Sequence, residues 1–171
     1  MKTLIIVYSY HHNNTEKIAN AMAEELKAEV EYPQNVNIEK LEDYDIIGFG
    51  AGIDSGKHYK PMLELAENLP KLNNKKAFIF STAGVGGDRK MKSDHNALRT
   101  ILQAKGYVII GEYACRGFNT NSVLKYFGGM NKNKPDMLDL QNAKAFAMEM
   151  QLEICSVEHE CRNTKKKAHA R

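Results

Sequence analysis

The sequence predicts an α/β protein with a doubly wound parallel sheet, and three observations support this. Apolar strand-like runs alternate along the chain with amphipathic helix-like runs. The strand-like runs are β-branched and aliphatic without polar alternation, as in parallel strands that are covered on both faces. Polar or glycine-rich loops follow several of these runs. Such alternation is typical of an open, right-handed sheet with helices on both sides.

The elements can be placed from these patterns. Strands are expected over residues 2–8, 30–32, 45–49, 76–81 and 107–113. Helices are expected over residues 14–27, 59–68, 95–105 and 138–155. In the first helix, Ile18, Met22 and Leu26 recur at four-residue spacing and therefore share one face. Residues 119–135 interrupt the alternation and are too long for a simple connector, which is typical of a functional loop.

Composition favours one globular domain. The chain has 171 residues, of which 43% are hydrophobic and 26% charged, as in ordinary globular domains. We expect the domain over residues 1–156, followed by a basic tail at 157–171. Lysines in this tail supply much of the net charge of +3, and such a tail is more often a solvated end than a nucleic-acid site.

The sequence favours a cytoplasmic location and contains no motif for a metal site. The apolar run Leu4 to Tyr8 is too short for a membrane span or a signal peptide. The three cysteines are Cys115, Cys155 and Cys161, an odd number without close pairing. We therefore expect reduced thiols and no bound metal.

The first strand leads into a polar loop that has the features of an anion site. Residues 9–15 carry hydroxyl, amide and imidazole groups just before a helix, where unpaired N–H groups and the helix dipole favour negative charge. The loop lacks the glycine and lysine of a P-loop, so it suits a terminal monophosphate such as that of FMN. Simple capping of the helix by Asn14 and Thr15 is the alternative interpretation.

Two further loops are rich in small residues. In AGIDSGKHY, residues 51–59, Gly52 and Gly56 permit close backbone approach, while Ile53 and Tyr59 offer apolar faces. STAGVGGD, residues 81–88, leaves backbone N–H groups free to reach a flat heteroaromatic ring. Either loop alone is better explained as a plain tight turn. At successive strand ends, where doubly wound sheets bind ligands, the three loops together indicate a phosphate at one end and a flat ring at the other.

Several segments carry a family resemblance. Ile6-Val7-Tyr8, followed by Asn14-Thr15-Glu16 and Ala19, is similar to the phosphate-loop signature of flavodoxins. YSYHHNNTEKIA, GIDSGKHYKP, STAG, CRGFNT and GGMNKNKPD resemble a flavodoxin-like subfamily. The resemblance implies a five-stranded sheet of order 2-1-3-4-5 and noncovalent FMN. It assigns the phosphate to Ser9, His11, Asn13, Asn14 and Thr15, and the ring to Gly52, Ile53, Tyr59, Ser81, Thr82, Ala83 and Gly84.

The implied function is electron transfer. We expect an FMN-binding carrier that shuttles low-potential electrons between redox protein partners, with no catalytic side chain, as a monomer or weak homodimer that binds neither nucleic acid nor membrane. The chain is not acidic and has no tryptophan, unlike typical flavodoxins, so Tyr59 and Phe118 are the candidates to stack on the ring. These differences keep open a flavin-dependent NAD(P)H or quinone reductase, whose substrate the loop 119–135 would cover.

Two other classes fit less well. A response-regulator receiver needs an acidic cluster after the first strand, where this chain has serine, histidine and asparagine. A binding module with an empty pocket remains an alternative. Two hypotheses concern the flavin itself: Gly52 or Gly56 permits a peptide turn that aims a backbone carbonyl at flavin N5–H, and FMN affinity weakens above about pH 7 as His11 and His12 lose charge.

Overall fold

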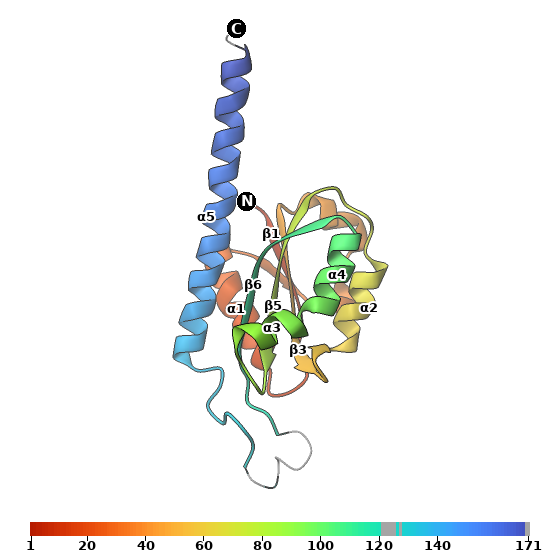
Figure 1. Cartoon of the computed structure of the whole chain (residues 1–171), viewed down its shortest axis with the longest axis vertical. Helices are drawn as coiled ribbons and strands as arrows, with labels where there is room; N and C mark the ends of the chain where they lie inside the picture. The colour runs from red at the N-terminus through yellow and green to blue at the C-terminus, as the bar shows by residue number, and fades with distance from the viewer. Residues whose placement is uncertain (121–125, 127, 170–171) are drawn as a thin grey trace.

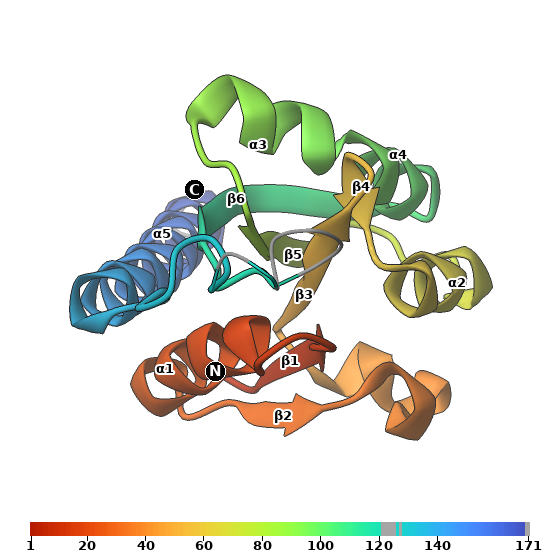
Figure 2. The same ribbon diagram turned by 90° about the horizontal axis from the view of Figure 1, so that it is seen from below.

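The computed structural model has a parallel five-stranded sheet between two layers of helices (Figures 1 and 2). It describes residues 1–120, 126 and 128–169, with side chains from 155 onward outside the description. The strands are β1 (Thr3–Tyr8), β2 (Glu29–Glu31), β3 (Ile46–Asp54), β5 (Lys75–Ala83) and β6 (Tyr107–Arg116). They are ordered β2-β1-β3-β5-β6, and the two-residue β4 (Lys57–His58) pairs antiparallel with β3. With β4 set aside, this is the predicted order 2-1-3-4-5, which is confirmed.

The helices cover the sheet in two pairs. Helix α1 (Asn14–Leu26) packs with α5 (Met137–His169) on one face, and α2 (Lys60–Asn68) packs with α4 (Asn96–Ala104) on the other, as Figure 2 shows. The short α3 (Asp88–Asp94) precedes α4, and two 3₁₀ turns, η1 (Pro33–Asn35) and η2 (Ile38–Asp43), precede β3.

The core is divided by the sheet into two apolar clusters. Successive residues of a strand point to opposite faces, so Leu4 and Ile6 of β1 join the cluster beneath α2 and α4. Ile5 and Val7 join the cluster beneath α1 and α5. All four are buried, which explains why β1 shows no polar alternation in the sequence.

Three features differ from the sequence expectation. β3 continues past Phe49 to Asp54 and turns back into β4. Helix α3 was not expected, because its sequence DRKMKSD is polar and only Asp94 is buried. Helix α5 runs to His169 rather than ending at Cys155. The expected basic tail at 157–171 therefore begins as helical backbone, while its side chains and residues 170–171 lie outside the description.

In the described part of the chain, no helix combines the length and the apolar character that a membrane span requires.

Candidate functional site

A cleft opens at the carboxyl ends of the strands, at the lower end of the molecule in Figure 1. Four loops form it, following β1, β3, β5 and β6. The cleft is open to solvent, and its volume is about 40 Å³, room for a few water molecules. The lining residues are Ser9, Tyr10, His11, Asn14, Thr15, Gly52, Ile53, Tyr59, Thr82, Ala83, Gly84, Gly117, Phe118 and Asn119.

The loop after β1 presents the start of α1 to the cleft. His12 and Asn13 have φ values of 54° and 52°, so the backbone turns sharply before the helix begins at Asn14. Asn13 makes no side-chain capping bond among the described residues. The Asn14 N–H donates to the His11 carbonyl over 3.3 Å. The start of a helix also carries N–H groups without a partner within the helix, and Asn14 and Thr15 line the cleft together with Ser9. The loop can therefore bind an anion.

Two hydrogen bonds fix the start of α1 to its neighbours, and the first of them is buried. The Oγ1 atoms of Thr15 and Thr82 are 2.8 Å apart and join α1 to the end of β5. Asn14 Nδ2 donates to the carbonyl of Phe118 over 2.8 Å, which joins α1 to the loop after β6. Asn14 Oδ1 is buried and has no hydrogen-bond partner among the described residues. It remains available to accept a hydrogen bond from a ligand.

The loop after β3 supplies an aromatic wall. The Tyr59 N–H donates to the carbonyl of Gly52 over 3.1 Å, and a Cβ on Gly52 would lie 2.6 Å from the Tyr59 ring. The Tyr59 ring thus packs closely against a glycine that leaves room for it. The Tyr59 ring is also 6.3 Å from the ring of Tyr10, which is 67% exposed. The two tyrosines border the open mouth of the cleft.

Gly52 and Gly56 have different conformations. Ser55 and Gly56 have φ values of 50° and 81° and form the turn between β3 and β4. Gly52 lies within β3 without a positive φ. Of the two glycines in the peptide-turn hypothesis, Gly56 therefore has the backbone conformation of a turn, but it lies outside the cleft lining.

The loops after β5 and β6 form the opposite wall. Asn131 Nδ2 donates to the carbonyl of Gly84 over 2.8 Å, and Asn119 and Met130 pair through both backbone N–H groups. A Cβ on Gly84 would lie 2.8 Å from the Met130 side chain. The described part of the loop 119–135 therefore packs against Gly84. Its residues 121–125 and 127, and with them part of the expected substrate cover, lie outside the description.

Ten of the twelve residues that the sequence singled out line this cleft, and Asn13 and Ser81 do not. Asn13 is exposed before α1. Ser81 is buried and bonds to His95 instead, because alternate residues of β5 face opposite sides of the sheet. His12 also lies outside the lining, with its ring 4.4 Å from that of Phe118.

The sequence assignment omitted Tyr10, Gly117 and Asn119, and named Phe118 only as a stacking candidate. Tyr10 lies inside the predicted phosphate loop and was identifiable from its position there. The other three belong to the loop after β6, which reaches α1 through the Asn14 bond to Phe118. A Cβ on Gly117 would lie 2.8 Å from Asn14 Nδ2. No local sequence pattern shows this long-range approach.

The described lining contains no lysine, arginine, aspartate or glutamate. An anion here would be held by helix N–H groups, hydroxyls, an amide and an imidazole. Such neutral donors suit a single phosphate group, whereas a triphosphate usually needs a lysine and a bound Mg²⁺.

Comparisons with known proteins agree with this architecture. The flavodoxin-domain family model matches residues 5–151. The uncharacterized protein MJ0298 of Methanocaldococcus jannaschii is 47% identical over 147 residues, covering 86% of this chain and 96% of that protein.

Solved structures share the fold at low identity. A flavodoxin from the domain Archaea has a TM-score of 0.65 at 15% identity, covering 90% of this chain and 99% of its own. Oxidised flavodoxin 2 from Bacillus cereus has a TM-score of 0.66 at 16% identity, with the same coverage. The structural likeness shows the fold, and the family model covers most of the chain. The chain belongs to the flavodoxin family.

Proposed function

We propose that this protein binds FMN in the cleft and carries electrons between redox proteins. The proposal rests on one observation: a single cleft contains both the start of α1, which has no side-chain cap, and an open mouth that Tyr10 and Tyr59 border. The start of the helix suits a phosphate, and the mouth suits a flat ring. FMN has both groups, separated by a short polyhydroxyl chain.

The residues present fit this cofactor at both ends. Gly52 and Gly84 line the cleft, and the absence of a side chain at each lets Tyr59 and Met130 pack closely against the backbone there. The buried Asn14 Oδ1 lacks a hydrogen-bond partner among the described residues, and a ribityl hydroxyl is a suitable donor. The cleft volume of about 40 Å³ is too small for the ring, so the ring would lie across the open mouth beside Tyr10 and Tyr59.

The chain's own residues would bind and orient the cofactor. Ser9, Thr15 and the first N–H groups of α1 would hold the phosphate, with His11 beside them. Tyr59 and Phe118 would border the ring, and the backbone after β5 would face its edge. Bound FMN supplies the redox chemistry, because its ring accepts one or two electrons.

A reductase of the same fold is the second candidate. The loop after β6 supports it, since Phe118 and Asn119 line the cleft and extend its wall on the solvent side. In such an enzyme, NAD(P)H or a quinone would stack against the exposed face of the ring.

Anaerobic reduction of the FMN-loaded protein distinguishes the two candidates. For a carrier we expect two resolved one-electron steps in a stepwise dithionite titration, and negligible flavin bleaching by NADH or NADPH. Rapid bleaching by a nicotinamide would instead favour the reductase. A failure to bind FMN at all would contradict both.

A further inference from the structure

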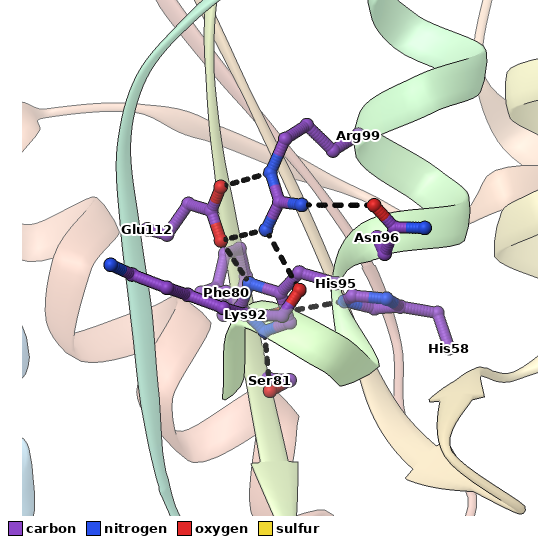
Figure 3. Close-up of polar contacts among 8 residues, drawn as sticks. All are labelled: His58, Phe80, Ser81, Lys92, His95, Asn96, Arg99 and Glu112. Atoms are coloured by element: carbon purple, nitrogen blue, oxygen red, sulfur yellow. Dashed lines mark hydrogen bonds and ion pairs between the residues drawn. The ribbon is translucent and has the colours of Figure 1, made fainter. Parts of the chain in front are cut away.

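A partly buried chain of polar contacts joins β5, the residue before α4, α4 itself and β6 (Figure 3). Ser81 Oγ lies 2.8 Å from His95 Nε2, and His95 Nδ1 lies 3.0 Å from Glu112 Oε2. Arg99 holds the same carboxylate at both oxygens, over 2.5 Å and 2.7 Å. His95 is completely buried, so both of its ring nitrogens depend on these protein partners.

The chain of contacts begins beside the cleft and ends at a second opening to solvent. At one end, Ser81 immediately precedes Thr82, which lines the cleft, and consecutive strand residues are about 3.3 Å apart along the strand. At the other end, Glu112 and Arg99 line a separate cavity of about 380 Å³ together with Met91 and Lys92. His95 is therefore close enough to the cleft to sense a charge there through the sheet, while its hydrogen-bond partners reach solvent on the other side.

We propose that His95 takes up a proton from solvent when a ligand in the cleft gains negative charge, with Ser81 and Glu112 as its positioning residues. This inference rests on the proposed function, because reduction of FMN is the event that adds the charge. Arg99 and Glu112 at the second cavity form the solvent end of the route.

The hydrogen bonds allow His95 to exist in two protonation states in the same position. In the neutral state, Nδ1–H donates to the Glu112 carboxylate and Nε2 accepts from the Ser81 hydroxyl. In the charged state, both ring nitrogens donate, and the Ser81 hydroxyl rotates to accept. The added proton is therefore held at Nε2, the nitrogen nearer the cleft. No heavy atom needs to move.

The groups around His95 balance one another in charge. Glu112 on β6 is paired with Arg99 on α4, and Asp94 at the end of α3 is paired with Lys90. From β4, the His58 ring lies 4.9 Å from that of His95, and the Lys92 chain lies at the cavity.

Burial and the surrounding charges act on the protonation of His95 in opposite directions. Burial lowers the pKa of His95, the neighbouring Glu112 and Asp94 carboxylates raise it, and the Arg99 charge lowers it. The net effect favours the neutral imidazole, and an additional negative charge within reach would favour the charged form.

The proton and electron balance is simple. An external low-potential donor supplies two electrons to FMN, and one proton from solvent binds at N5, which leaves the ring with one additional negative charge. A full negative charge about 10 Å away favours protonation of an imidazole about tenfold, and we expect a change of this size at His95. A tenfold change corresponds to uptake of at most about half a proton at the most favourable pH. The loaded protein therefore gains two electrons, one proton at the flavin and a further fraction of a proton at His95, which partly compensates the ring charge.

The direct test is NMR of the FMN-loaded protein labelled with ¹⁵N-histidine. The ring nitrogens of His95 are titrated with pH in the oxidised protein and again after anaerobic reduction with dithionite. We expect the protonation constant of His95 to increase about tenfold on reduction. A change of less than about threefold would overturn the inference, because such coupling corresponds to a distant charge screened by solvent.

Variants provide the independent readout. His95→Gln should remove the fractional proton uptake that exceeds one proton per FMN reduced, measured with a pH indicator in weak buffer across a range of pH, while His58→Leu should retain it. Loss of this additional uptake in His58→Leu, or its persistence in His95→Gln, would contradict the inference. If His95→Gln does not fold, the NMR titration of the unmodified protein still decides. FMN binding is measured first, so a failure there contradicts the proposed function rather than the role of His95.

Discussion

The Oγ1 atoms of Thr15 and Thr82 lie 2.8 Å apart in the buried floor of the cleft. This contact joins the first turn of α1 to the carboxyl end of β5, the two elements that would hold opposite ends of FMN. In the proposed complex, the Thr15 hydroxyl would therefore both stabilise the floor of the cleft and contact the phosphate of FMN.

Replacing this hydroxyl should affect phosphate binding specifically. Thr15→Val is expected to weaken FMN binding about tenfold or more, since hydrogen bonds to charged groups contribute about 1.5–3 kcal/mol. Riboflavin, which has no phosphate, should bind almost as before, and Thr15→Ser should restore FMN affinity. Fluorescence titrations with both flavins measure this. An equal loss for riboflavin would show that Thr15 acts on the whole cleft rather than on the phosphate.

Alanine substitutions at Gly52 and Gly86 should have different effects on stability. A Cβ on Gly52 would lie 2.6 Å from the Tyr59 ring, whereas one on Gly86 would meet Arg116 at 3.5 Å, an ordinary contact. Gly52→Ala should therefore reduce the free energy of unfolding by about 1–3 kcal/mol and displace Tyr59, while Gly86→Ala should change it little. Urea denaturation of both variants is the measurement. Equal free energies of unfolding for the two variants would contradict this prediction, because they would show that Tyr59 can move away from residue 52 without loss of stability.

Burial of His58 should make stability depend on pH. Burial, followed by the charge of His95, lowers the pKa of His58 to about 3, against about 6.5 in an unfolded chain. Between these values the unfolded chain binds a proton that the folded one does not, so stability should fall as the pH decreases below about 6.5, by at most about 1.4 kcal/mol per pH unit for one proton. His58→Leu should flatten this dependence in urea denaturation between these pH values.

The matched control for this effect is His12→Leu, because His12 is exposed. It should leave the pH dependence of stability unchanged. If the pH dependence of stability persisted in His58→Leu and disappeared in His12→Leu, it would have to be assigned to His12 rather than to His58.

Of the two histidines in the phosphate loop, the structure favours His11 as the one that contacts the ligand. His11 lines the cleft, whereas the Nε2 of His12 bonds to Thr120 Oγ1 over 2.9 Å. His11→Ala should therefore weaken FMN binding severalfold, because a hydrogen-bond donor near the phosphate is lost, and His12→Ala should weaken it less. Fluorescence titration of both variants with FMN is the measurement. A larger loss of FMN affinity in His12→Ala than in His11→Ala would contradict this assignment.

The sheet was predictable because its strands are buried on both faces. Ile5 and Ile6 of β1 enter different clusters, and this removes polar alternation and leaves an apolar run that local sequence reveals. β4 and α3 lack such a signal. β4 has only two residues. In α3 the only buried residue is Asp94, which forms an ion pair with Lys90 of the same helix.

The cleft was predictable in part for a related reason. Loops after parallel strands meet at one edge, so the first three loops could be grouped from the sequence. Phe118 and Asn119 could not be placed there, because they depend on the long-range bond from Asn14. Ser81 shows a further limit: a polar residue at a strand end faces either the cleft or the helices, and here it faces His95.

The most direct test of the account is a titration of the purified apoprotein with FMN, followed by flavin fluorescence, with riboflavin in parallel. Binding of one FMN per chain, with riboflavin markedly weaker, is the predicted result, because the start of α1 would hold the phosphate. Flavin fluorescence that stays unchanged at all FMN concentrations would contradict FMN binding, and with it electron transfer through this cleft.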